Sequence, residues 1–352
     1  MLNYLRLLLY PFSLIYGLVV LTRNKFYDWG IFKSNSFNLP VICIGNLVVG
    51  GAGKTPTTEY LVRLLADYKI AILSRGYGRK TKGFLIADEQ ATVQTIGDEP
   101  MQYHHKFAGV TVAVCEDRVK GITILKDSHD VILLDDAYQH RAVKAGFNIL
   151  LFEFNKLLKK QFLLPAGNLR EHLSNYDRAN AVLITKSPSP VNIVDQIEIR
   201  RKIDLTLEQR ISFSSINYGQ LTNLFSKETL DLATLTHATV FLLTGIANPE
   251  PLFQHIKSYT PNIERFEYPD HHDFSKEDLK KLINAFNVHP AKEKLIITTE
   301  KDTQRLLGDN LKDLLLNLPI YYLPIEIALA PKDKLTFDQN ILNYVANAKR
   351  IS

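Results

Sequence analysis

The chain has 352 residues, of which 46% are hydrophobic and 22% charged, fractions that are ordinary for a folded globular protein. They exclude a disordered chain, a fibrous repeat and a protein with many membrane spans, and the length predicts about two domains. The formal net charge of +5 is too small to indicate nucleic-acid binding. Both cysteines, Cys43 and Cys115, lie in apolar runs typical of strands, so no disulfide framework is expected.

The first apolar segment lies at the N-terminus, where fifteen of residues 2–21 are apolar. Its uncharged part, residues 7–21, is shorter than the roughly 20 residues that span a bilayer. No small-residue cleavage site of a signal peptide follows. We therefore expect residues 1–24 to form a helix at the membrane interface, with a membrane span and a buried core helix as alternatives.

The polar residues of this segment recur every three or four positions and would form one narrow stripe of a helix. If the helix is interfacial, Arg6, Ser13 and Gly17 should face the protein or water. Three cations, Arg23, Lys25 and Lys33, follow the segment and would face anionic headgroups on the cytoplasmic side.

From Pro40 onward, short apolar strands alternate with helices. Strands are predicted at Val41–Ile44, Lys69–Leu73, Val110–Val114, Val131–Leu134, Ile149–Phe152 and Ala181–Ile184, and helices at Thr57–Tyr68 and Asp117–Leu125. This alternation predicts an α/β fold with a mostly parallel sheet and helices on both faces. After a break at 187–190, a second α/β run includes strands at Val240–Leu243 and Leu295–Thr298. We place the first domain at 25–210 and a smaller α/β domain at 211–352.

A glycine-rich loop, Gly50-Gly51-Ala52-Gly53-Lys54-Thr55, follows the first predicted strand and opens a helix. Such loops bring backbone N–H groups close to phosphate oxygens, while the lysine reaches the β- and γ-phosphates and the threonine hydroxyl can ligate Mg²⁺. Val48 stands where the strict pattern has its first glycine. We predict a P-loop NTPase-like fold in which Val48, Val49 and residues 50–55 contact the nucleotide.

A strand ending in Asp135-Asp136 resembles the acidic end of a Walker-B strand, which holds Mg²⁺. Either carboxylate could contact the metal. The segment Thr185-Lys186-Ser187-Pro188 lacks the asparagine and aspartate of a guanine-binding N-K-x-D, so ATP is the expected nucleotide.

Four further segments could serve a phosphoryl acceptor, although each alone is more often a salt-bridged loop than a site. They are Ser74–Arg79, Gly97–Pro100, Pro165–Glu171 and Pro269–Phe274. In the last of these, a histidine oriented by an aspartate is a better interpretation than a metal cluster, because cysteines and helical spacing are missing.

Together these motifs resemble the tetraacyldisaccharide 4′-kinase (lipid A 4′-kinase) family of Gram-negative bacteria. The matching segments run in order from about residue 40 to 302: 45–46 with 50–56, 74–79, 97–100, 135–141, 164–167, 244–249, 270–274 and 298–302. The apolar N-terminal helix matches as well, whereas the last fifty residues add nothing.

The resemblance implies transfer of the ATP γ-phosphoryl group to the 4′-hydroxyl of tetraacyldisaccharide 1-phosphate, giving lipid IVA in lipid A biosynthesis. The enzyme would act at the cytoplasmic face of the bacterial inner membrane, which residues 1–24 would contact. ATP and Mg²⁺ are the implied cofactors. No oligomeric state is predicted.

The resemblance also assigns roles to single residues. Asp98 would be the base that takes the hydroxyl proton, paired with His271 across the two domains. Lys54 and one of Arg75, Arg79 and Arg118 would neutralise developing charge, and Thr55 and Asp135 or Asp136 would hold Mg²⁺. Gln139 and Arg141 would bridge to nucleotide or acceptor.

Two other classes of function compete with this interpretation. A P-loop ATPase switch or metallochaperone at the membrane surface would need no base in a second domain. A membrane-tethered scaffold with a vestigial P-loop would be expected to lose Lys54 or Thr55, and both are present.

Overall fold

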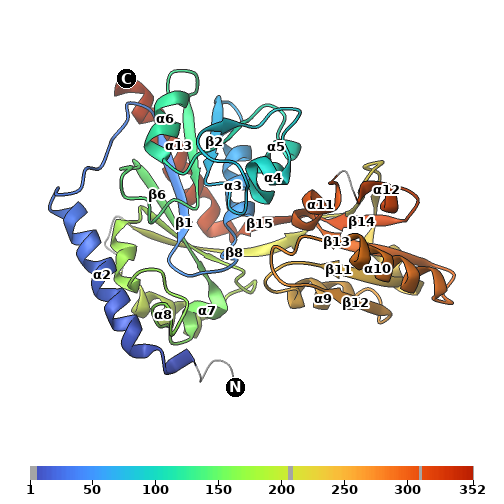
Figure 1. The fold of residues 1–352 in the computed structure, drawn as a ribbon. Helices are drawn as coiled ribbons and strands as arrows, with labels where there is room; N and C mark the ends of the chain where they lie inside the picture. Colours follow the sequence, from blue (N-terminus) through green and yellow to red (C-terminus); the bar gives the residue numbers. More distant parts are fainter. Residues whose placement is uncertain (1–5, 205–208, 309–310, 352) are drawn as a thin grey trace.

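Two sheets organise the chain in the computed structural model, which describes residues 6–204, 209–308 and 311–351 (Figure 1). The first sheet has the order β15 (Ile325–Leu329), β8 (Arg210–Tyr218), β7 (Ala181–Thr185), β6 (Phe147–Glu153), β1 (Val41–Asn46), β5 (Val131–Asp135), β2 (Ile70–Ser74), β4 (Thr111–Val114) and β3 (Leu85–Ile86). Neighbouring strands are parallel except at the edges, where β15 and β3 run antiparallel. The mostly parallel sheet predicted from the sequence is confirmed.

Helices cover both faces of this sheet because successive strand residues point to opposite sides. On one face, Ile42 and Ile44 pack with α3 (Lys54–Leu64), α5 (Asp98–Lys106) and α13 (Pro331–Ile351). On the other, Val41 and Cys43 pack with α6 (Arg118–Leu125), α7 (Phe154–Leu158) and α8 (Ile193–Lys202). Short helical turns also occur at α4 (Val93–Ile96) and η1 (Leu173–Arg178).

The second sheet is smaller and has the order β10 (Thr229–Leu230), β9 (Leu221–Asn223), β14 (Ile320–Leu323), β13 (Lys294–Thr299), β11 (Thr239–Thr244) and β12 (Ile263–Glu267). The helices of this unit are η2 (Leu232–His237), α9 (Glu250–Lys257), α10 (Lys276–Val288), α11 (Glu300–Leu306) and α12 (Lys312–Leu315). Its cores form between the sheet and α10 with α11 on one side and α9 on the other.

The boundary between the units differs from the predicted ranges of 25–210 and 211–352. Strand β8 pairs with β7 and then continues as an antiparallel ribbon with β15, so both strands belong to the first sheet. Helix α13 returns as well, and its Phe337, Ile341 and Val345 are buried in the first core. The apolar residues of α13 recur at helical spacing, which predicts a helix. This spacing does not indicate which of the two cores the helix packs against.

Helix α2 (Tyr10–Asp28) lies along one side of the first unit and contacts it through its polar stripe (Figure 1). The Ser13 hydroxyl donates to the Leu163 carbonyl and accepts from the Ala166 N–H, both at 3.0 Å. Arg6 donates to the carbonyls of Pro165 (3.0 Å) and Gly167 (2.6 Å). At Gly17, an added Cβ would lie 2.7 Å from Leu163 Cδ1. Residues 1–5 of the predicted helix lie outside the described residues.

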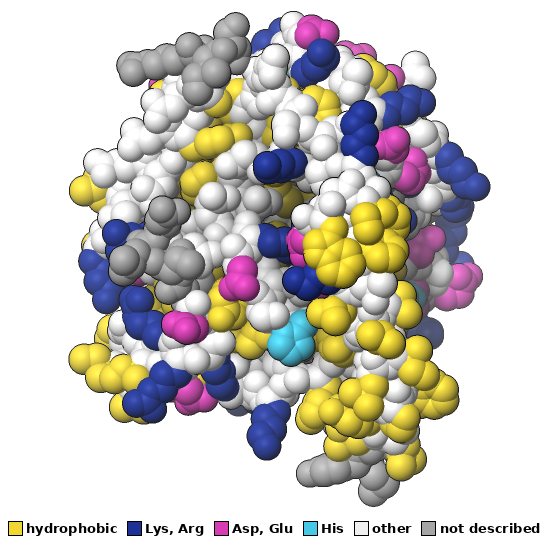
Figure 2. Space-filling model, turned by 90° about the vertical axis from the view of Figure 1, so that its left-hand side faces the viewer, with side chains coloured by type: hydrophobic (Ala, Val, Ile, Leu, Met, Phe, Trp, Pro, Cys, Tyr) yellow, Lys and Arg dark blue, Asp and Glu magenta, His cyan; other side chains and the backbone are white. Residues whose placement is uncertain are grey.

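The opposite face of α2 and the turn before it expose apolar side chains to solvent, as Figure 2 shows. They are Leu7, Leu8, Leu9, Tyr10, Phe12, Leu14, Ile15, Leu18, Val19 and Leu21, and we call them the apolar face. This exposure is incompatible with the buried core helix kept as an alternative. None of the described helices has the length and apolarity required to cross a membrane.

One expected membrane cation turns toward the protein instead. The Arg23 guanidinium donates to the carbonyl of Gln139 at 2.9 Å, whereas Lys25 and Lys33 are exposed. Arg141 fixes the same end of the helix by donating to the Asn24 carbonyl at 2.7 Å and pairing with Asp28 at 2.8 Å.

Candidate active site

The phosphate loop joins the C-terminal end of β1, at the centre of the first sheet, to α3. Gly50 and Gly53 have φ values of 104° and 82°, a region that favours glycine. Helix α3 begins at Lys54, so the first N–H groups of the helix have no partner within it and can bind an anion. Pro56 lies in this first turn, where a missing N–H costs little.

Side chains at or beyond the C-terminal ends of β5 and β7 hold the end of β1 and the loop by their carbonyl groups. Gln139 donates to the Asn46 carbonyl at 2.9 Å, Thr185 to that of Ala52 at 2.8 Å and Lys186 to that of Gly51 at 2.7 Å. This anchoring uses carbonyl groups. Of the loop's N–H groups, those of Val49 and Ala52 donate to the carbonyls of Asn168 and Gly50, and those that open α3 have no partner within the helix. Gln139 thus supports the loop in this structure, a role that the sequence did not indicate.

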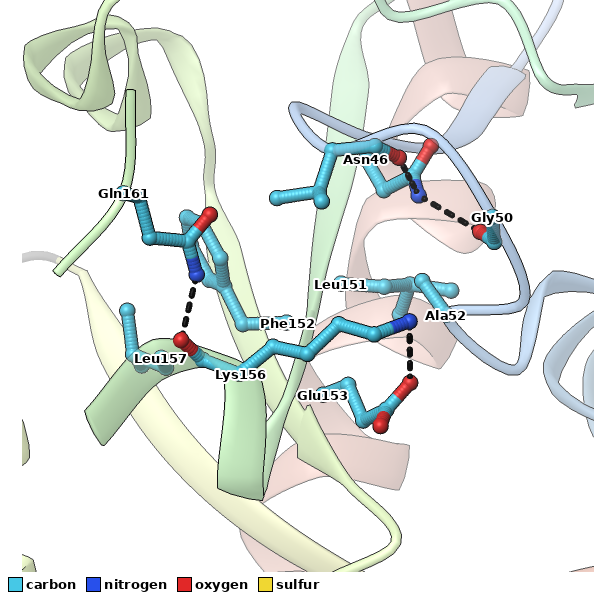
Figure 3. Close-up of a pocket in the computed structure, with 10 residues that line it drawn as sticks. Asn46, Gly50, Ala52, Leu151, Phe152, Glu153, Lys156, Leu157 and Gln161 are labelled. Atoms are coloured by element: carbon cyan, nitrogen blue, oxygen red, sulfur yellow. Dashed lines mark hydrogen bonds and ion pairs between the residues drawn. The ribbon is translucent and has the colours of Figure 1, made fainter. Parts of the chain in front are cut away.

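A small pocket lies beside the loop, between it and the end of β6 (Figure 3). Asn46, Gly50 and Ala52 line it from the loop, and Phe152, Glu153 and Lys156 from β6 and α7. The Lys156 ammonium pairs with Glu153 at 2.9 Å, and Lys186 contacts the same carboxylate at 3.3 Å. Two lysines therefore lie close to the loop, and both contact the carboxylate of Glu153.

The two valines expected to contact nucleotide attach the loop to the 165–170 segment. Val48 is buried and bridges Leu169, and the Val49 N–H donates to the Asn168 carbonyl at 2.8 Å. Val48 fills the place of the missing glycine by packing inward.

The acidic pair at the end of β5 divides into two different environments. Asp135 is completely buried, and neither of its carboxylate oxygens has a hydrogen-bond partner among the described residues. Burial, with the nearby charges of Glu99 and Asp136, raises the pKa of Asp135 to about 7. Asp136 instead pairs with Lys54 at 3.7 Å and with Arg170 at 3.1 Å.

An unpartnered buried carboxylate is costly unless a cation or donor joins it. Carboxylate and hydroxyl oxygens are the ligands that Mg²⁺ takes together with nucleotide phosphates. Asp135 and the first-turn Thr55 therefore fit a magnesium ion. No cluster of three or more His, Cys, Asp or Glu side chains suited to a metal ion occurs among the described residues.

The three arginines expected near the transferred phosphate are placed differently. Arg79 is buried and donates to the Gly83 carbonyl at 2.7 Å and to Glu116 at 2.6 Å, so it holds its own loop. Arg118 is buried and donates to the Cys115 carbonyl at 3.1 Å. Arg75 is exposed. Arg170, which lies in a candidate segment but had no assigned role, is the arginine that contacts Asp136.

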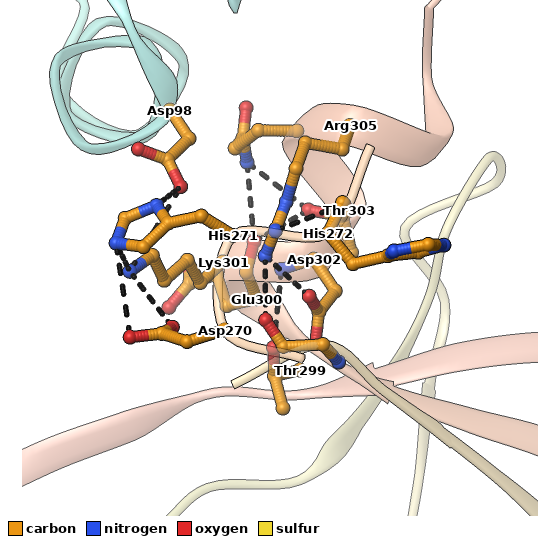
Figure 4. A network of polar contacts seen from close by, with 12 residues as sticks. Asp98, Asp270, His271, His272, Thr299, Glu300, Lys301, Asp302, Thr303 and Arg305 are labelled. Carbon is orange, nitrogen blue, oxygen red and sulfur yellow. Dashed lines mark hydrogen bonds and ion pairs between the residues drawn. The ribbon is translucent and has the colours of Figure 1, made fainter. Parts of the chain in front are cut away.

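Asp98 and His271 meet across the two units (Figure 4). His271 Nδ1 lies 2.9 Å from Asp98 Oδ2, and we call this pair the dyad. Asp98 begins α5 and its side chain is 5% exposed, whereas that of His271 is 33% exposed. Burial raises the pKa of Asp98, but the hydrogen bond from His271 and the charge of Lys301 outweigh it, so this pKa lies below its usual value. The predicted contact across the domains is therefore present in the structure.

Lys301 contacts the dyad and had no role assigned from the sequence. Its Nζ lies 3.2 Å from His271 Nε2 and 3.8 Å from Asp98 Oδ2. Glu99 and Asp270 lie 3.8 and 3.9 Å from the same nitrogen. The only sequence signal was its position in the 298–302 motif.

A second set of contacts joins the units at the other end of α5. Lys106 donates to Glu59 of α3 and to Glu300 of α11, both at 2.8 Å. Nearby, His105 Nδ1 lies 2.7 Å from Gln304 Oε1. Helix α5 is thus held against the second unit at both of its ends.

A P-loop at the centre of a parallel sheet, facing a histidine–aspartate pair from a second unit, defines a P-loop protein equipped for phosphoryl transfer. Comparison with known proteins shows its family. The profile of the family described as tetraacyldisaccharide-1-P 4′-kinase (LpxK) matches residues 5–346, and the chain belongs to this family.

Individual relatives are similar to this protein in sequence or structure along almost the whole chain. A tetraacyldisaccharide 4′-kinase of Bacteroides thetaiotaomicron is 44% identical, covering 98% of this chain and 94% of the relative. One from Flavobacterium johnsoniae is 46% identical, covering 97% and 98%. A crystal structure of LpxK from Aquifex aeolicus in complex with ATP has a TM-score of 0.74 at 30% identity, covering 97% of this chain and 99% of that one.

Proposed function

We propose that the protein transfers the γ-phosphoryl group of ATP to the 4′-hydroxyl of a tetraacyldisaccharide 1-phosphate, a kinase step of lipid A biosynthesis. The observation that carries the proposal is the contact between Asp98 and His271, which supplies a proton acceptor from a second unit. An ATPase switch needs no such group, and a vestigial loop would not keep Lys54 at the end of an intact P-loop.

The chain's own residues account for most of what the reaction requires. The N-terminal turn of α3 and Lys54 would hold the phosphates and neutralise charge that develops in the transition state. Thr55 and Asp135 would hold Mg²⁺, which when bound offsets charge on the β- and γ-phosphates. Arg170, beside Asp136, is the arginine best placed to add positive charge.

Proton transfer involves the dyad. A carboxyl whose pKa lies below the usual value is a weak base, and Asp98 is also buried. The more exposed His271 would take the hydroxyl proton at Nε2, and Asp98 would stabilise the imidazolium that forms. This proposal gives Asp98 a supporting role in place of the direct role as base that the family resemblance implies. The acceptor oxygen then bonds to the γ-phosphorus, and the bridging P–O bond breaks to release ADP.

Labelled ATP and a detergent-dispersed acylated disaccharide 1-phosphate test this activity. With γ-labelled ATP, the label should appear on the lipid, at the 4′-position. Label released only as free phosphate, with none on the lipid, would contradict the kinase and favour the ATPase switch.

A lipid with four acyl chains stays in a membrane, so we propose that its kinase reaches it through the apolar face of α2. The protein would then work at the cytoplasmic face of the bacterial inner membrane, where ATP is available. The polar stripe supports this arrangement, because it attaches the helix to the protein while the apolar face remains uncovered.

Charges placed on the apolar face should weaken membrane binding. Each of Ile15→Asp and Leu18→Asp should lower partitioning onto anionic lipid vesicles by about ten- to a hundredfold, because each removes a side chain worth about 1.5–3 kcal/mol on burial. Sedimentation with vesicles measures this, and ATP affinity should not change. Val288→Asp is a matched control, since Val288 is 72% exposed but belongs to the second unit. Equal loss of vesicle binding in the control would contradict the assignment.

A further inference from the structure

The chain turns directly after α2, and this turn exposes large apolar side chains. Trp29, Ile31 and Phe32 are 67%, 61% and 41% exposed, and Gly30 between them has a φ of 72°. We call residues 29–32 the Trp29 turn. It lies beyond the apolar face and beyond the segment 1–24 that was expected at the membrane. Figure 2 shows hydrophobic side chains along α2 from its lower end, near the N-terminus, to its upper end, where the turn follows.

Hydrogen bonds hold the backbone of the Trp29 turn in this exposed position. The Trp29 N–H donates to the Lys25 carbonyl at 2.8 Å, which continues the helical pattern by one residue. The Phe32 N–H donates to the Phe26 carbonyl at 3.0 Å, and the two rings pack edge-on with their centroids 5.3 Å apart. Because the turn is already folded, it loses little conformational entropy when it binds a surface.

The Trp29 turn extends the apolar face along one side of α2. At about 100° per residue, Ile15, Leu18 and Trp29 lie within about 60° of one another around the helix axis. Ser13, which contacts the protein, lies about 160° from Trp29 on the same scale. From Leu8 to Trp29 this shared side is roughly 30 Å long at 1.5 Å per residue. A surface that contacts both of its ends must run parallel to the helix axis.

The composition of the turn and its neighbours fits an anionic lipid surface. Tryptophan and phenylalanine beside lysine are typical of the membrane–water interface, where the rings lie at headgroup level and the ammonium groups contact anionic lipids. Lys25 and Lys33 are exposed on either side of the turn. The nearby Asp28 pairs with Arg141 at 2.8 Å, which offsets its negative charge. The surface is also continuous with the apolar face, for which we have already proposed a membrane contact.

The end of α2 that carries the turn is attached to the segment that follows the acidic end of β5. Arg23 donates to the Gln139 carbonyl at 2.9 Å, and the Gln139 side chain donates to the Asn46 carbonyl at the end of β1. Beyond the turn, the Ser34 hydroxyl donates to the Arg141 carbonyl at 2.7 Å. Any depth at which the turn binds lipid therefore fixes the height of the phosphate loop above the bilayer as well.

We propose that the Trp29 turn is a second lipid contact, which lays α2 parallel to an anionic bilayer and holds the active site at headgroup level. The proposal rests on the membrane contact and the kinase function proposed above, and it adds the orientation of the enzyme. A helix inserted through its N-terminal end alone would instead leave Trp29 in water, roughly 30 Å from Leu8.

The fluorescence of Trp29, the only tryptophan in the chain, tests this contact without turnover. On addition of vesicles of phosphatidylcholine and phosphatidylglycerol, the emission maximum should move to shorter wavelength. Lipids brominated near the headgroup should quench the emission more strongly than lipids brominated near the end of the acyl chain. Vesicle binding with unchanged emission would overturn the proposal. So would a shift that appears without vesicles and grows with protein concentration, because it would assign the turn to a second copy of the chain.

Turnover tests the position of the active site. When Trp29→Ser and Ile31→Ser are combined, kcat for an acylated disaccharide 1-phosphate embedded in vesicles should fall about tenfold even with all the protein bound, because the site is misplaced. With the detergent-dispersed acceptor, kcat should stay close to that of the wild type. Leu8→Ser is the matched control, since Leu8 is exposed at the other end of the same side.

Leu8→Ser should weaken vesicle binding but leave kcat on saturating vesicles unchanged. An equal kcat for the control and the double variant on saturating vesicles, or an equal loss by the double variant in detergent, would contradict the positioning role. Failure of lipid labelling in the wild type would count against the kinase function, whereas the fluorescence result would still decide whether the turn contacts lipid.

Discussion

Replacing His271 with alanine should lower kcat for lipid phosphorylation by about 10²–10⁴-fold, the usual contribution of a positioned general base. Asp98→Asn should produce a loss of the same order, because an amide cannot stabilise the imidazolium. The KM for ATP should change little in both, since neither residue belongs to the phosphate loop. The double variant should be no worse than the stronger single one, because the two residues act as a unit.

Steady-state kinetics with the detergent-dispersed acceptor measures these values. His272→Gln provides the control, because His272 also contacts an aspartate, Asp278, at 2.9 Å but within the second unit alone. Its kcat should stay near that of the wild type. Unchanged turnover in both dyad variants would refute the assignment of the proton acceptor.

Asp135→Asn should have opposite effects on activity and on stability. Loss of the carboxylate should lower kcat by about 10²–10³-fold and weaken binding of magnesium-ATP relative to ATP alone. The free protein should nevertheless become more stable by about 1–3 kcal/mol, because an uncharged amide costs less to bury without a partner than an ionised carboxylate does. The penalty applies above the pKa of about 7, because burial has raised that pKa and the ionised form is the one destabilised.

Calorimetric binding and denaturant unfolding at pH 8, without metal, measure the two effects. Asp302→Asn is the contrasting control. Asp302 is equally buried but pairs with Arg305 and accepts from Thr299 and the Gly245 N–H, so its neutralisation should destabilise the protein by about 3–5 kcal/mol. If Asp135→Asn also destabilised the metal-free protein, the Asp135 carboxylate could not be the unpartnered group that we describe.

The sequence predicted those parts of the site that follow from local geometry. The P-loop and the acidic end of β5 come directly after buried strands, and parallel strands bring their carboxyl ends to one edge of the sheet. The contact between Asp98 and His271 came from the family resemblance, since 173 positions separate them along the chain. The polar stripe of α2 was also visible, because its period of three to four residues reflects one helical face.

Other features of the site and fold could not be predicted, because they depend on how distant segments pack together. Asp135 and Asp136 are adjacent acids, and only the buried end of β5 shows which is paired and which is not. Arg79 and Arg170 both lie in glycine-containing loops, and the sequence does not distinguish them. In the structure, Arg79 pairs with Glu116 and Arg170 pairs with Asp136. Likewise, nothing in the sequences of β15 and α13 indicates that these elements return to the first sheet.

The connection between the two units has a consequence for engineering, because it shows how one unit can be removed from the other. The chain leaves the first sheet through β8 and re-enters it through β15, and Tyr218 pairs directly with Ile325. Everything from 219 to 324 is therefore inserted into a hairpin whose two ends already lie side by side. A short turn in place of the insertion would close that hairpin and leave the first sheet with the nine strands that the structure describes. The unit that contains the P-loop is therefore separable from the unit that supplies His271.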